Sequence, residues 1–288
     1  PVAGRNIQFE KPIRTQPKKK VVIIGGGAAG LEAARRCAEN GDSVVLFEKE
    51  RELGGSLIPA GANSLKGDIA RYAAWSVRTA QRTPGVDIRL GVAATPELVR
   101  AEKPDALIIA VGAEPIIPKI PGIDRENVCL ATDIDLGKKK AGRRVVLIGA
   151  GLTGTETAVA LAREGHDVTL VDMRSLEEID GRGAAARGVV GLLRKMASES
   201  GVRTLTGLTA REITEEGLVV SSSDGQTQLF PADTVVLSMG VRPRTAVAEQ
   251  FAGCAPEVYF VGDCGRQNGN ITSAVRDAFF AAMNIAGV

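Results

Sequence analysis

Short apolar runs that end at a glycine recur along the chain. Two of them are residues 21–24, which stop at Gly25, and residues 106–111, which stop at Gly112. Runs of this length are typical of strands buried on both faces of a parallel sheet, and they are far too short to cross a bilayer. Helix-forming stretches rich in alanine lie between such runs, so the pattern predicts an α/β fold.

An internal repeat organises the chain. Residues 20–49 align with residues 144–173 without a gap, and twelve of the thirty aligned positions are identical. Each copy reads as a strand, a glycine-rich turn, an alanine-rich helix that stops at Gly41 or Gly165, and a second strand. Because this order is the building unit of a dinucleotide-binding domain, we expect two Rossmann-like domains.

Each copy carries the spacing G-x-G-x-x-G directly after its first strand. In a dinucleotide-binding turn the first glycine permits the sharp bend, the second lets backbone approach a pyrophosphate, and the third lets helix and strand pack closely. The unpaired N–H groups and the dipole of the helix start then favour phosphate. Two structural units with empty turns are the alternative. The glycines are Gly25, Gly27 and Gly30 in the first copy and Gly149, Gly151 and Gly154 in the second.

An acid ends the second strand of each copy. Glu48 and Asp172 both lie 18 residues beyond the third glycine of their motif, close to the spacing of a carboxylate that accepts from ribose hydroxyls. A carboxylate at Asp172 repels a 2′-phosphate and favours NADH, whereas Arg174, two residues on, weakens that preference. NADH is therefore the expected cofactor, and NADPH is the less expected one.

Two further segments match each other, one after each repeat. Residues 107–115 and 235–243 each predict an apolar strand followed by a glycine and then a proline. We expect these segments to close the two nucleotide sites from the other side, at Ala110, Val111 and Gly112 in the first unit and at Gly240 in the second.

Composition argues against several other classes of function. The 36 basic and 34 acidic residues give a formal net charge of +2, which favours neither nucleic acid nor an anionic membrane as a partner. The four cysteines have no CxxC spacing, which argues against a disulfide framework, a metal site and dithiol chemistry, and fits a reducing cytoplasm. The single histidine, His166, is expected in a surface loop, so no metal ligands are predicted.

The chain resembles the C-terminal FAD/NAD(P)-binding module of the 2,4-dienoyl-CoA reductase, enoate reductase and trimethylamine dehydrogenase family, within the pyridine nucleotide-disulfide reductase superfamily. The segments that carry the resemblance are residues 1–5, 25–34, 53–57, 120–123 and 256–264. In that family an FMN-binding barrel and an iron–sulfur cluster precede this region. The resemblance implies that both belong to an upstream part of the same polypeptide.

The resemblance assigns FAD to the first unit and the nicotinamide dinucleotide to the second. The implied FAD contacts are Gly25, Gly27, Ala28, Ala29, Gly30, Glu48, Lys49, Gly54, Gly55, Ser56, Ala110, Val111, Gly112, Gly262 and Asp263. The implied nicotinamide dinucleotide contacts are Gly149, Gly151, Leu152, Thr153, Gly154, Glu156, Asp172 and Gly240. Ala28 and Ser56 stand where relatives usually have proline and glutamine, so the local flavin contacts are expected to differ.

Two acids have open alternatives. Asp263 matches an aspartate that hydrogen-bonds the ribityl chain, and a simple turn residue is the alternative. Glu156 matches a glutamate that contacts the nicotinamide end in relatives. Because Glu32 occupies the equivalent place in the first repeat, an ordinary acid in the first helical turn is the alternative for Glu156.

We therefore expect a nicotinamide-binding domain inserted into an FAD-binding domain. The expected order is a linker at residues 1–17, FAD-binding residues 18–125, NAD(P)-binding residues 126–231 and FAD-binding residues 232–288. Such a module passes a hydride from NADH to FAD and then feeds the iron–sulfur cluster and FMN barrel for C=C reduction. The cofactors do this chemistry, so no catalytic side chain is predicted. The alternatives are an ADP-binding structural or docking domain, and a stand-alone NAD(P)H oxidase or ferredoxin-type reductase.

Overall fold

The computed structural model describes residues 17–181, 187–265 and 269–287, which form two compact units. The first unit comprises the described residues up to Gly61, Asp68–Glu114 and the residues from Val241 onward. The second comprises Ala62–Gly67 and Pro115–Gly240. Apart from Pro17, the linker expected at residues 1–17 lies outside the described residues.

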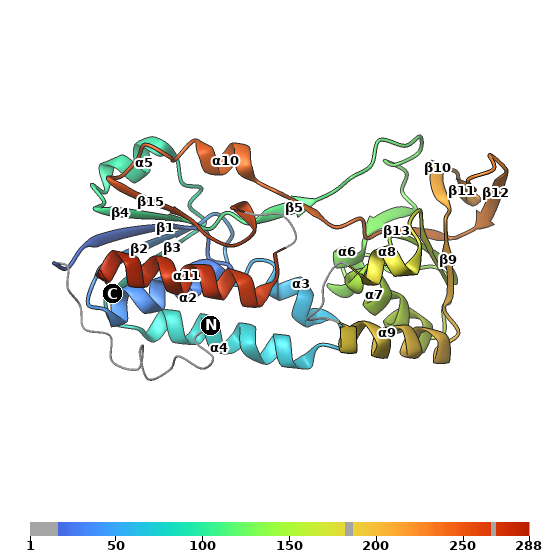
Figure 1. Ribbon diagram of the computed structural model, residues 1–288, viewed down its shortest axis with the longest axis horizontal. Helices are drawn as coiled ribbons and strands as arrows, with labels where there is room; N and C mark the ends of the chain where they lie inside the picture. The colour runs from blue at the N-terminus through green and yellow to red at the C-terminus, as the bar shows by residue number, and fades with distance from the viewer. Residues whose placement is uncertain (1–16, 182–186, 266–268, 288) are drawn as a thin grey trace. The chain divides into compact units, whose positions relative to one another are not determined.

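The first unit is built on a five-stranded parallel sheet (Figure 1). β4 is buried along its whole length and β1 along all but its first residue, which explains why both read as continuous apolar runs. In spatial order the strands are β15 (Glu257–Phe260), β4 (Ala106–Ile109), β1 (Lys20–Ile24), β2 (Ser43–Glu48) and β3 (Val86–Leu90).

Helices cover both faces of this sheet. α2 (Ala28–Glu39) and α11 (Ile271–Ala286) lie against one face, and α5 (Pro96–Ala101) and α10 (Thr245–Glu249) against the other (Figure 1). Alternate residues of β1 follow this division, because Val21 packs in the cluster with α2 and α11 while its neighbour packs with α5 and α10. The remaining elements of this part of the chain are α3 (Leu57–Ala62), α4 (Gly67–Arg82) and the 3₁₀ turn η2 (Gly262–Cys264).

The second unit repeats this sheet with a different cover. α7 (Leu152–Arg163) and α9 (Arg187–Glu199) pack on one face, and an antiparallel sheet of β10 (Thr209–Ile213), β11 (Gly217–Ser221) and β12 (Thr227–Pro231) packs on the other. The five parallel strands are β6 (Val128–Leu130), β13 (Thr234–Leu237), β7 (Arg144–Ile148), β8 (Asp167–Asp172) and β9 (Arg203–Thr206). Two short helices, α6 (Ala131–Asp135) and α8 (Leu176–Asp180), complete the unit. The predicted α/β class with two Rossmann-like domains is confirmed.

One edge strand of each five-stranded sheet comes from a different place in the sequence: in the first sheet it follows the other four strands, and in the second it precedes them. In the first unit β15 comes from the last segment of the sequence and pairs with β4. In the second unit the matching position is held by β6, which precedes the repeat and pairs with β13. The first unit is therefore assembled from discontinuous segments. The chain leaves it within β5 (Ala113–Pro115), after Glu114, and returns at β14 (Val241–Pro243), and these two strands pair with each other.

The boundaries between the units differ from those expected at 125/126 and 231/232. The units change after Glu114 and after Gly240. The reason lies in packing, because β13 hydrogen-bonds to β7 in the middle of the second sheet, and Ile120 and Ile123 pack on the core that covers this sheet. The short segment Ala62–Gly67 also belongs to the second unit, which the sequence did not indicate.

None of the helices in the described part of the chain combines the length and apolar character needed to span a bilayer.

Candidate functional site

The three glycines of the first turn are required for three different reasons. Gly25 has φ of 101°, and a Cβ there would lie 2.5 Å from the carbonyl oxygen of Ala110. A Cβ at Gly30 would lie 1.8 Å from the oxygen of Gly25, so this glycine lets α2 approach β1. At Gly27, by contrast, none of the described atoms lies within 4 Å of the added Cβ. The open side of the turn is therefore at Gly27, where a bound group can reach the backbone.

The second turn repeats this geometry. Gly149 has φ of 109°, and its Cβ would lie 2.2 Å from the oxygen of Ser238. A Cβ at Gly154 would lie 2.0 Å from the oxygen of Gly149, whereas one at Gly151 would meet no described atom within 4 Å. Both turns thus leave the middle glycine open, as an approaching diphosphate requires.

The helices that follow the turns begin without a side-chain cap. Gly27 starts α2 and Gly151 starts α7, and in the described structure no side chain accepts a hydrogen bond at either start, nor does an acid lie in either first turn. The first N–H groups of a helix have no intrahelical partner and carry the positive end of its dipole. Each turn therefore offers the N–H groups and partial charge that bind an anion such as a diphosphate.

The acids at the strand ends are held by backbone N–H groups. Glu48 is 6% exposed, and its carboxylate accepts from the N–H of Gly26 at 2.6 Å and of Glu50 at 2.8 Å. Asp172 is 4% exposed and accepts from the N–H of Ala150 at 2.9 Å. Both carboxylates lie directly beside their glycine turn, which is where the adenosine ribose binds in Rossmann domains.

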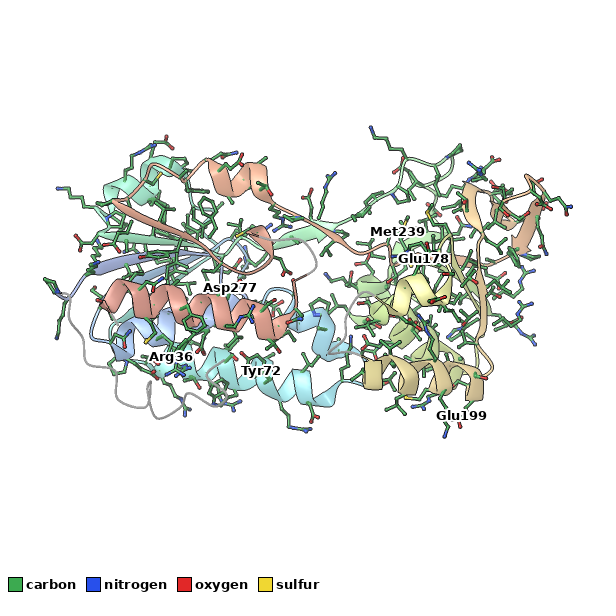
Figure 2. All side chains as sticks on the ribbon, viewed as in Figure 1. Arg36, Tyr72, Glu178, Glu199, Met239 and Asp277 are labelled. Carbon is green, nitrogen blue, oxygen red and sulfur yellow. The ribbon has the colours of Figure 1, made fainter. Side chains whose placement is uncertain are left out.

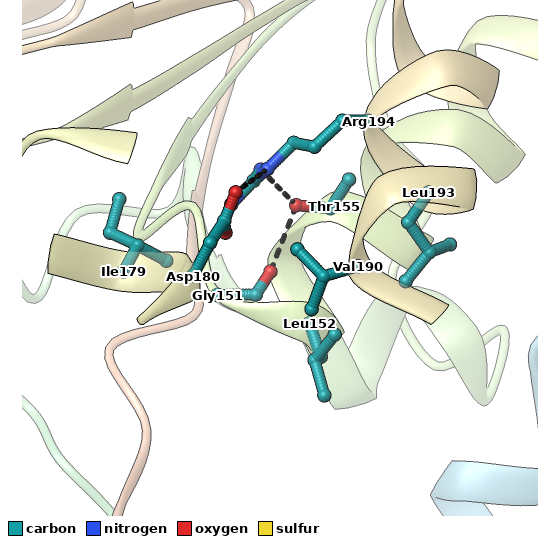
Figure 3. A pocket seen from close by; sticks show the side chains of 8 residues that line it. All are labelled: Gly151, Leu152, Thr155, Ile179, Asp180, Val190, Leu193 and Arg194. Carbon is teal, nitrogen blue, oxygen red and sulfur yellow. Dashed lines mark hydrogen bonds and ion pairs between the residues drawn. The ribbon is translucent and has the colours of Figure 1, made fainter. Parts of the chain in front are cut away.

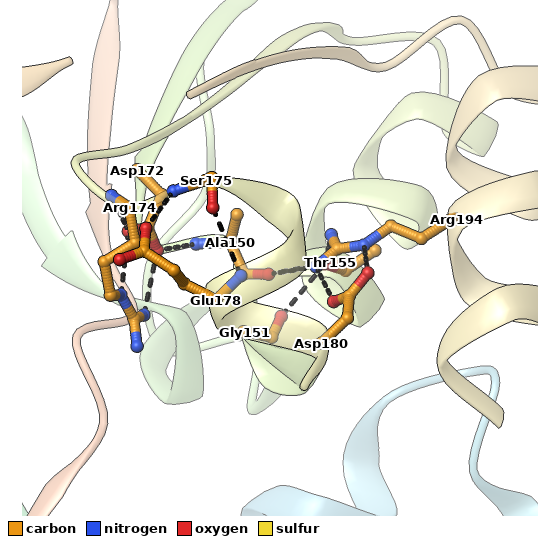
Figure 4. A network of polar contacts seen from close by, with 9 residues as sticks. All are labelled: Ala150, Gly151, Thr155, Asp172, Arg174, Ser175, Glu178, Asp180 and Arg194. Atoms are coloured by element: carbon orange, nitrogen blue, oxygen red, sulfur yellow. Dashed lines mark hydrogen bonds and ion pairs between the residues drawn. The ribbon is translucent and has the colours of Figure 1, made fainter. Parts of the chain in front are cut away.

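Asp172 has an additional partner that Glu48 lacks among the described residues. The Arg174 guanidinium donates to both carboxylate oxygens at 3.1 Å, and the Arg174 N–H donates at 2.9 Å (Figure 4). Burial alone would raise the pKa of Asp172, but the bonds from Arg174 and Ala150 outweigh it and hold the pKa below its usual value. Asp172 is therefore ionised at neutral pH and already paired.

The glycine pair of residues 54 and 55 packs on the first turn. The N–H of Gly54 donates to the carbonyl of Gly26 at 2.9 Å, and a Cβ at Gly55 would lie 3.2 Å from the Cα of Gly27. Both have positive φ, 123° and 51°, so a side chain at either position would be strained. Of the neighbouring predicted contacts, Lys49 and Ser56 are exposed, and Ala28 and Ala29 form the first turn of α2.

The ends of β4 and β15 bring further predicted residues to the same edge of the sheet. The N–H of Ala110 donates to Ile24 at 2.8 Å, so residues 110–112 begin beside the turn. Gly262 follows β15, and a Cβ there would lie 3.2 Å from the Cβ of Ala29. Asp263 lies in η2, half-buried, with one carboxylate oxygen next to Gly269. The carboxyl ends of parallel strands are the usual ligand-binding edge of such sheets.

In the second unit, the remaining predicted contacts lie at the start of α7 and after β13. Leu152 and Thr153 are exposed at the beginning of α7, directly after Gly151. Gly240 has φ of 84°, and its carbonyl accepts from the N–H of Ile116 at 3.0 Å. Gly240 thus lies shortly after β13, where the chain leaves the parallel sheet of the second unit.

Glu156 forms an ion pair that the sequence did not indicate. The Nζ of Lys66 lies 2.6 Å from Oε2 of Glu156, and the two side chains are 14% and 15% exposed. Asp135 is close to this pair and accepts from Asn63 at 2.9 Å and from Thr157 at 3.2 Å. Burial raises the pKa of Asp135, although Asn63, Lys66 and Thr157 counteract it.

The equivalent glutamate of the first repeat has local partners. Glu32 is 6% exposed and pairs with Arg35 at 2.7 Å and with Arg36 at 3.0 Å, both on its own helix. Arg36, which is labelled in Figure 2, also places its guanidinium over the ring of Phe279 from α11, 5.1 Å from the ring centroid. The equivalent glutamates of the two repeats thus lie in different environments. Glu32 pairs with arginines on its own helix, whereas Glu156 pairs with Lys66, which is ninety positions away in sequence.

Beside the second turn lies a small cavity of about 50 Å³ (Figure 3). Gly151, Thr155 and Arg194 are among the residues that line it. Arg194 projects from α9 and pairs with Asp180 of α8 at 2.6 Å. Sequence reasoning did not select either residue, because both lie in a helical region without a motif.

No group of three His, Cys, Asp or Glu side chains among the described residues is arranged to hold a metal. The side chains of all four cysteines are buried. His166 is partly buried, and its Nδ1 lies 2.7 Å from the carbonyl oxygen of Gly142, so its role is structural.

Two parallel sheets, each with an open glycine turn and an acid at the end of its second strand, define a class of protein that binds two dinucleotides. The chain belongs to the pyridine nucleotide-disulphide oxidoreductase family, whose model matches residues 19–278. Members of this family bind FAD and NAD(P)H.

Curated relatives and solved structures agree with this family. The chain is 37% identical over 281 residues to a bilirubin reductase of Mediterraneibacter gnavus, covering 97% of this chain and 43% of the relative. It is 35% identical to an NADH oxidase of Thermoanaerobacter brockii, covering 99% of this chain and 44% of that protein. A structure of 2-naphthoyl-CoA reductase superposes with a TM-score of 0.81 at 30% identity, covering 94% of this chain and 40% of that one. The chain thus spans less than half the length of these relatives.

Proposed function

We propose that this chain is the electron-entry module of a larger flavoenzyme, in which NADH reduces FAD. The observation that carries the proposal is the presence of two open glycine turns, at Gly27 and Gly151, in a chain of this family. The bound cofactors supply the hydride chemistry. The chain's own residues bind the two dinucleotides, orient them and neutralise their phosphates.

FAD is assigned to the first unit. Gly27 and the start of α2 receive its diphosphate, Glu48 accepts from its adenosine ribose, and Asp263 accepts from its ribityl hydroxyls. The Gly54–Gly55 segment packs on the turn of the first unit, and the family resemblance places this segment along the flavin nucleotide, so it supports this assignment. Asn270 caps α11, so the start of this helix is fixed close after Asp263.

The nicotinamide dinucleotide is assigned to the second unit, with a preference for NADH. Gly151 and the start of α7 receive the diphosphate, and the ionised Asp172 lies where the adenosine ribose binds and repels a 2′-phosphate. Arg174 is engaged by Asp172, which limits its use as a phosphate ligand. Glu156 contacts the nicotinamide end, with Lys66 holding its carboxylate.

Electrons leave FAD for an upstream part of the polypeptide. This chain spans less than half the length of a cinnamate reductase of Clostridium sporogenes, to which it is 30% identical, and of the bilirubin reductase. Both names are those of reductases. The family resemblance implies that an iron–sulfur cluster and an FMN barrel lie upstream and reduce a C=C bond in the cytoplasm. A stand-alone NADH oxidase is the second candidate, favoured by the relative from Thermoanaerobacter brockii. An ADP-binding docking domain is the third.

An anaerobic titration tests the proposal. Purified protein is loaded with FAD and mixed with NADH, and bleaching of the flavin absorbance is expected within seconds. Flavin binding without bleaching favours the docking domain, and failure to bind flavin rejects the assignment of the first unit. Fast oxygen consumption without any upstream segment favours the oxidase.

A further inference from the structure

The backbone of the second residue of each glycine turn is held from both sides. In the first turn the N–H of Gly26 donates to Glu48, and its carbonyl accepts from the N–H of Gly54 at 2.9 Å. In the second turn the N–H of Ala150 donates to Asp172, and its carbonyl accepts from the guanidinium of Arg194 at 2.8 Å. The carbonyl thus accepts from the backbone N–H of Gly54 in the first unit and from the charged side chain of Arg194 in the second.

Arg194 makes further bonds to the same turn. Its guanidinium donates to the hydroxyl of Thr155 at 2.9 Å, and this hydroxyl in turn donates to the carbonyl of Gly151 at 2.9 Å (Figure 4). Thr155 is 1% exposed, so this contact is shielded from water. Arg194 therefore fixes the carbonyl group of Ala150 directly and that of Gly151 through Thr155.

Asp180 fixes Arg194 itself. Its carboxylate accepts from the guanidinium at 2.6 and 3.2 Å, and the Arg194 side chain is 19% exposed. Charge-assisted bonds of this fork geometry restrict a guanidinium more than a single bond would. Carbonyl groups that are fixed in this way also fix the direction of the N–H groups that follow them at the start of α7.

We propose that Arg194 is a positioning residue for the diphosphate of the nicotinamide dinucleotide, which it serves by orienting the turn at Ala150 and Gly151. The proposal rests on the assignment of that dinucleotide to the second unit. Arg194 acts through the backbone and is not a catalytic residue. It takes the place that Gly54 holds at the FAD turn.

The test compares ligands with and without a diphosphate. In Arg194→Met the dissociation constant for ADP-ribose is expected to rise about ten- to a hundred-fold, the effect of losing charge-assisted bonds. Binding of adenosine, measured by ligand-observed NMR, should change less than threefold, because adenosine has no phosphate to position. Arg194→Lys should recover part of the affinity for ADP-ribose. Lys195→Met is the matched control, since Lys195 lies on the exposed side of α9, where it pairs with Glu199, and this variant should bind like the wild type.

The outcomes separate this proposal from the function on which it rests. Wild-type protein that fails to bind ADP-ribose rejects the assignment of the second unit. Wild-type binding with unchanged binding by Arg194→Met overturns the role of Arg194. An equal loss of ADP-ribose and adenosine binding also overturns it, because such a loss indicates general damage to the unit. If Arg194→Met does not fold, Arg194→Lys and Asp180→Asn decide, and wild-type affinity for ADP-ribose in both rejects the proposal.

Discussion

Lys66 and Glu156 are ninety positions apart in sequence and form an ion pair of 2.6 Å. Lys66 belongs to a six-residue segment, Ala62–Gly67, that packs with the second unit although the chain on both sides of it belongs to the first. Asn63 in the same segment donates to Asp135 at 2.9 Å. Polar side chains therefore attach this segment both to α7, which follows the second glycine turn, and to α6, which precedes it.

The first prediction concerns the strength of this pair. Glu156→Gln should lower the free energy of unfolding by about 1–3 kcal/mol, because it leaves a largely buried ammonium without its closest anion. Denaturant unfolding of Glu156→Gln, Lys66→Met and the double variant measures the coupling between the two. A coupling energy near zero would show that the pair contributes nothing to stability.

A second prediction separates the two roles open for Glu156. If its carboxylate contacts the nicotinamide end, Glu156→Gln should slow flavin reduction at saturating NADH at least about tenfold, the effect of about 1.4 kcal/mol in the barrier. The dissociation constant for ADP-ribose should stay the same, because this ligand lacks the nicotinamide. Glu32→Gln is the control from the first repeat. An unchanged rate of flavin reduction would identify Glu156 as a structural acid only.

The middle glycines allow the two nucleotide sites to be switched off one at a time. Gly27→Ala should abolish FAD binding and Gly151→Ala should abolish NADH binding, while the apo proteins keep the wild-type melting temperature. Neither substitution strains the backbone, since φ is −81° at Gly27 and −69° at Gly151, and each Cβ meets open space. Gly30→Ala is the contrasting control and should fail to fold, because its Cβ would lie 1.8 Å from Gly25. Retention of FAD by Gly27→Ala would speak against the assigned site.

Cofactor preference should respond in opposite directions at Asp172 and Arg174. Arg174→Ala removes the guanidinium bonds to Asp172 and should strengthen the preference for NADH. Asp172→Ala releases Arg174 toward a 2′-phosphate and should raise the ratio of NADPH to NADH efficiency about tenfold or more. Steady-state kcat/KM with both cofactors measures the ratio. A wild type that uses both equally well would contradict the expected preference.

Thiol reactivity is expected to be low and to depend on alkaline pH. Burial, assisted by the nearby charge of Asp133, raises the pKa of Cys129 to about 11. The folded thiol stays protonated while the unfolded one ionises near pH 9, so its contribution to stability is complete below pH 9 and is lost as the pH rises toward 11. Cys129→Ala should flatten the fall in melting temperature across this range. An aromatic disulfide reagent at pH 8 should titrate no thiol quickly in the native protein and four after unfolding.

Local features of the sequence predicted much of the fold. The glycine turns and buried strands were predictable because each depends on residues within one strand–helix–strand unit. For example, β1 (Lys20–Ile24) differs from the apolar run at 21–24 by one residue. The contacts of Lys66 and Arg194 were not, because their partners lie 90 and 44 positions away and no motif accompanies them. The boundary was predicted at 231/232 and lies after Gly240. The apolar sequence of β13 is compatible with a central strand in either sheet, so it does not indicate to which unit β13 belongs. Which nucleotide each turn binds stays a prediction.

The origin of the two outermost strands sets an order for folding during synthesis. Every strand of the second sheet has been made once Leu237 leaves the ribosome, whereas the first sheet lacks its edge until β15 and its α11 cover follow. Domains fold as units while the chain emerges from the ribosome, so the second unit can fold before the sheet of the first unit is complete. A nascent chain stalled shortly after Gly240 would thus contain every strand of the second sheet but only four of the five strands of the first, and FAD binding is predicted only once β15 and α11 have been made.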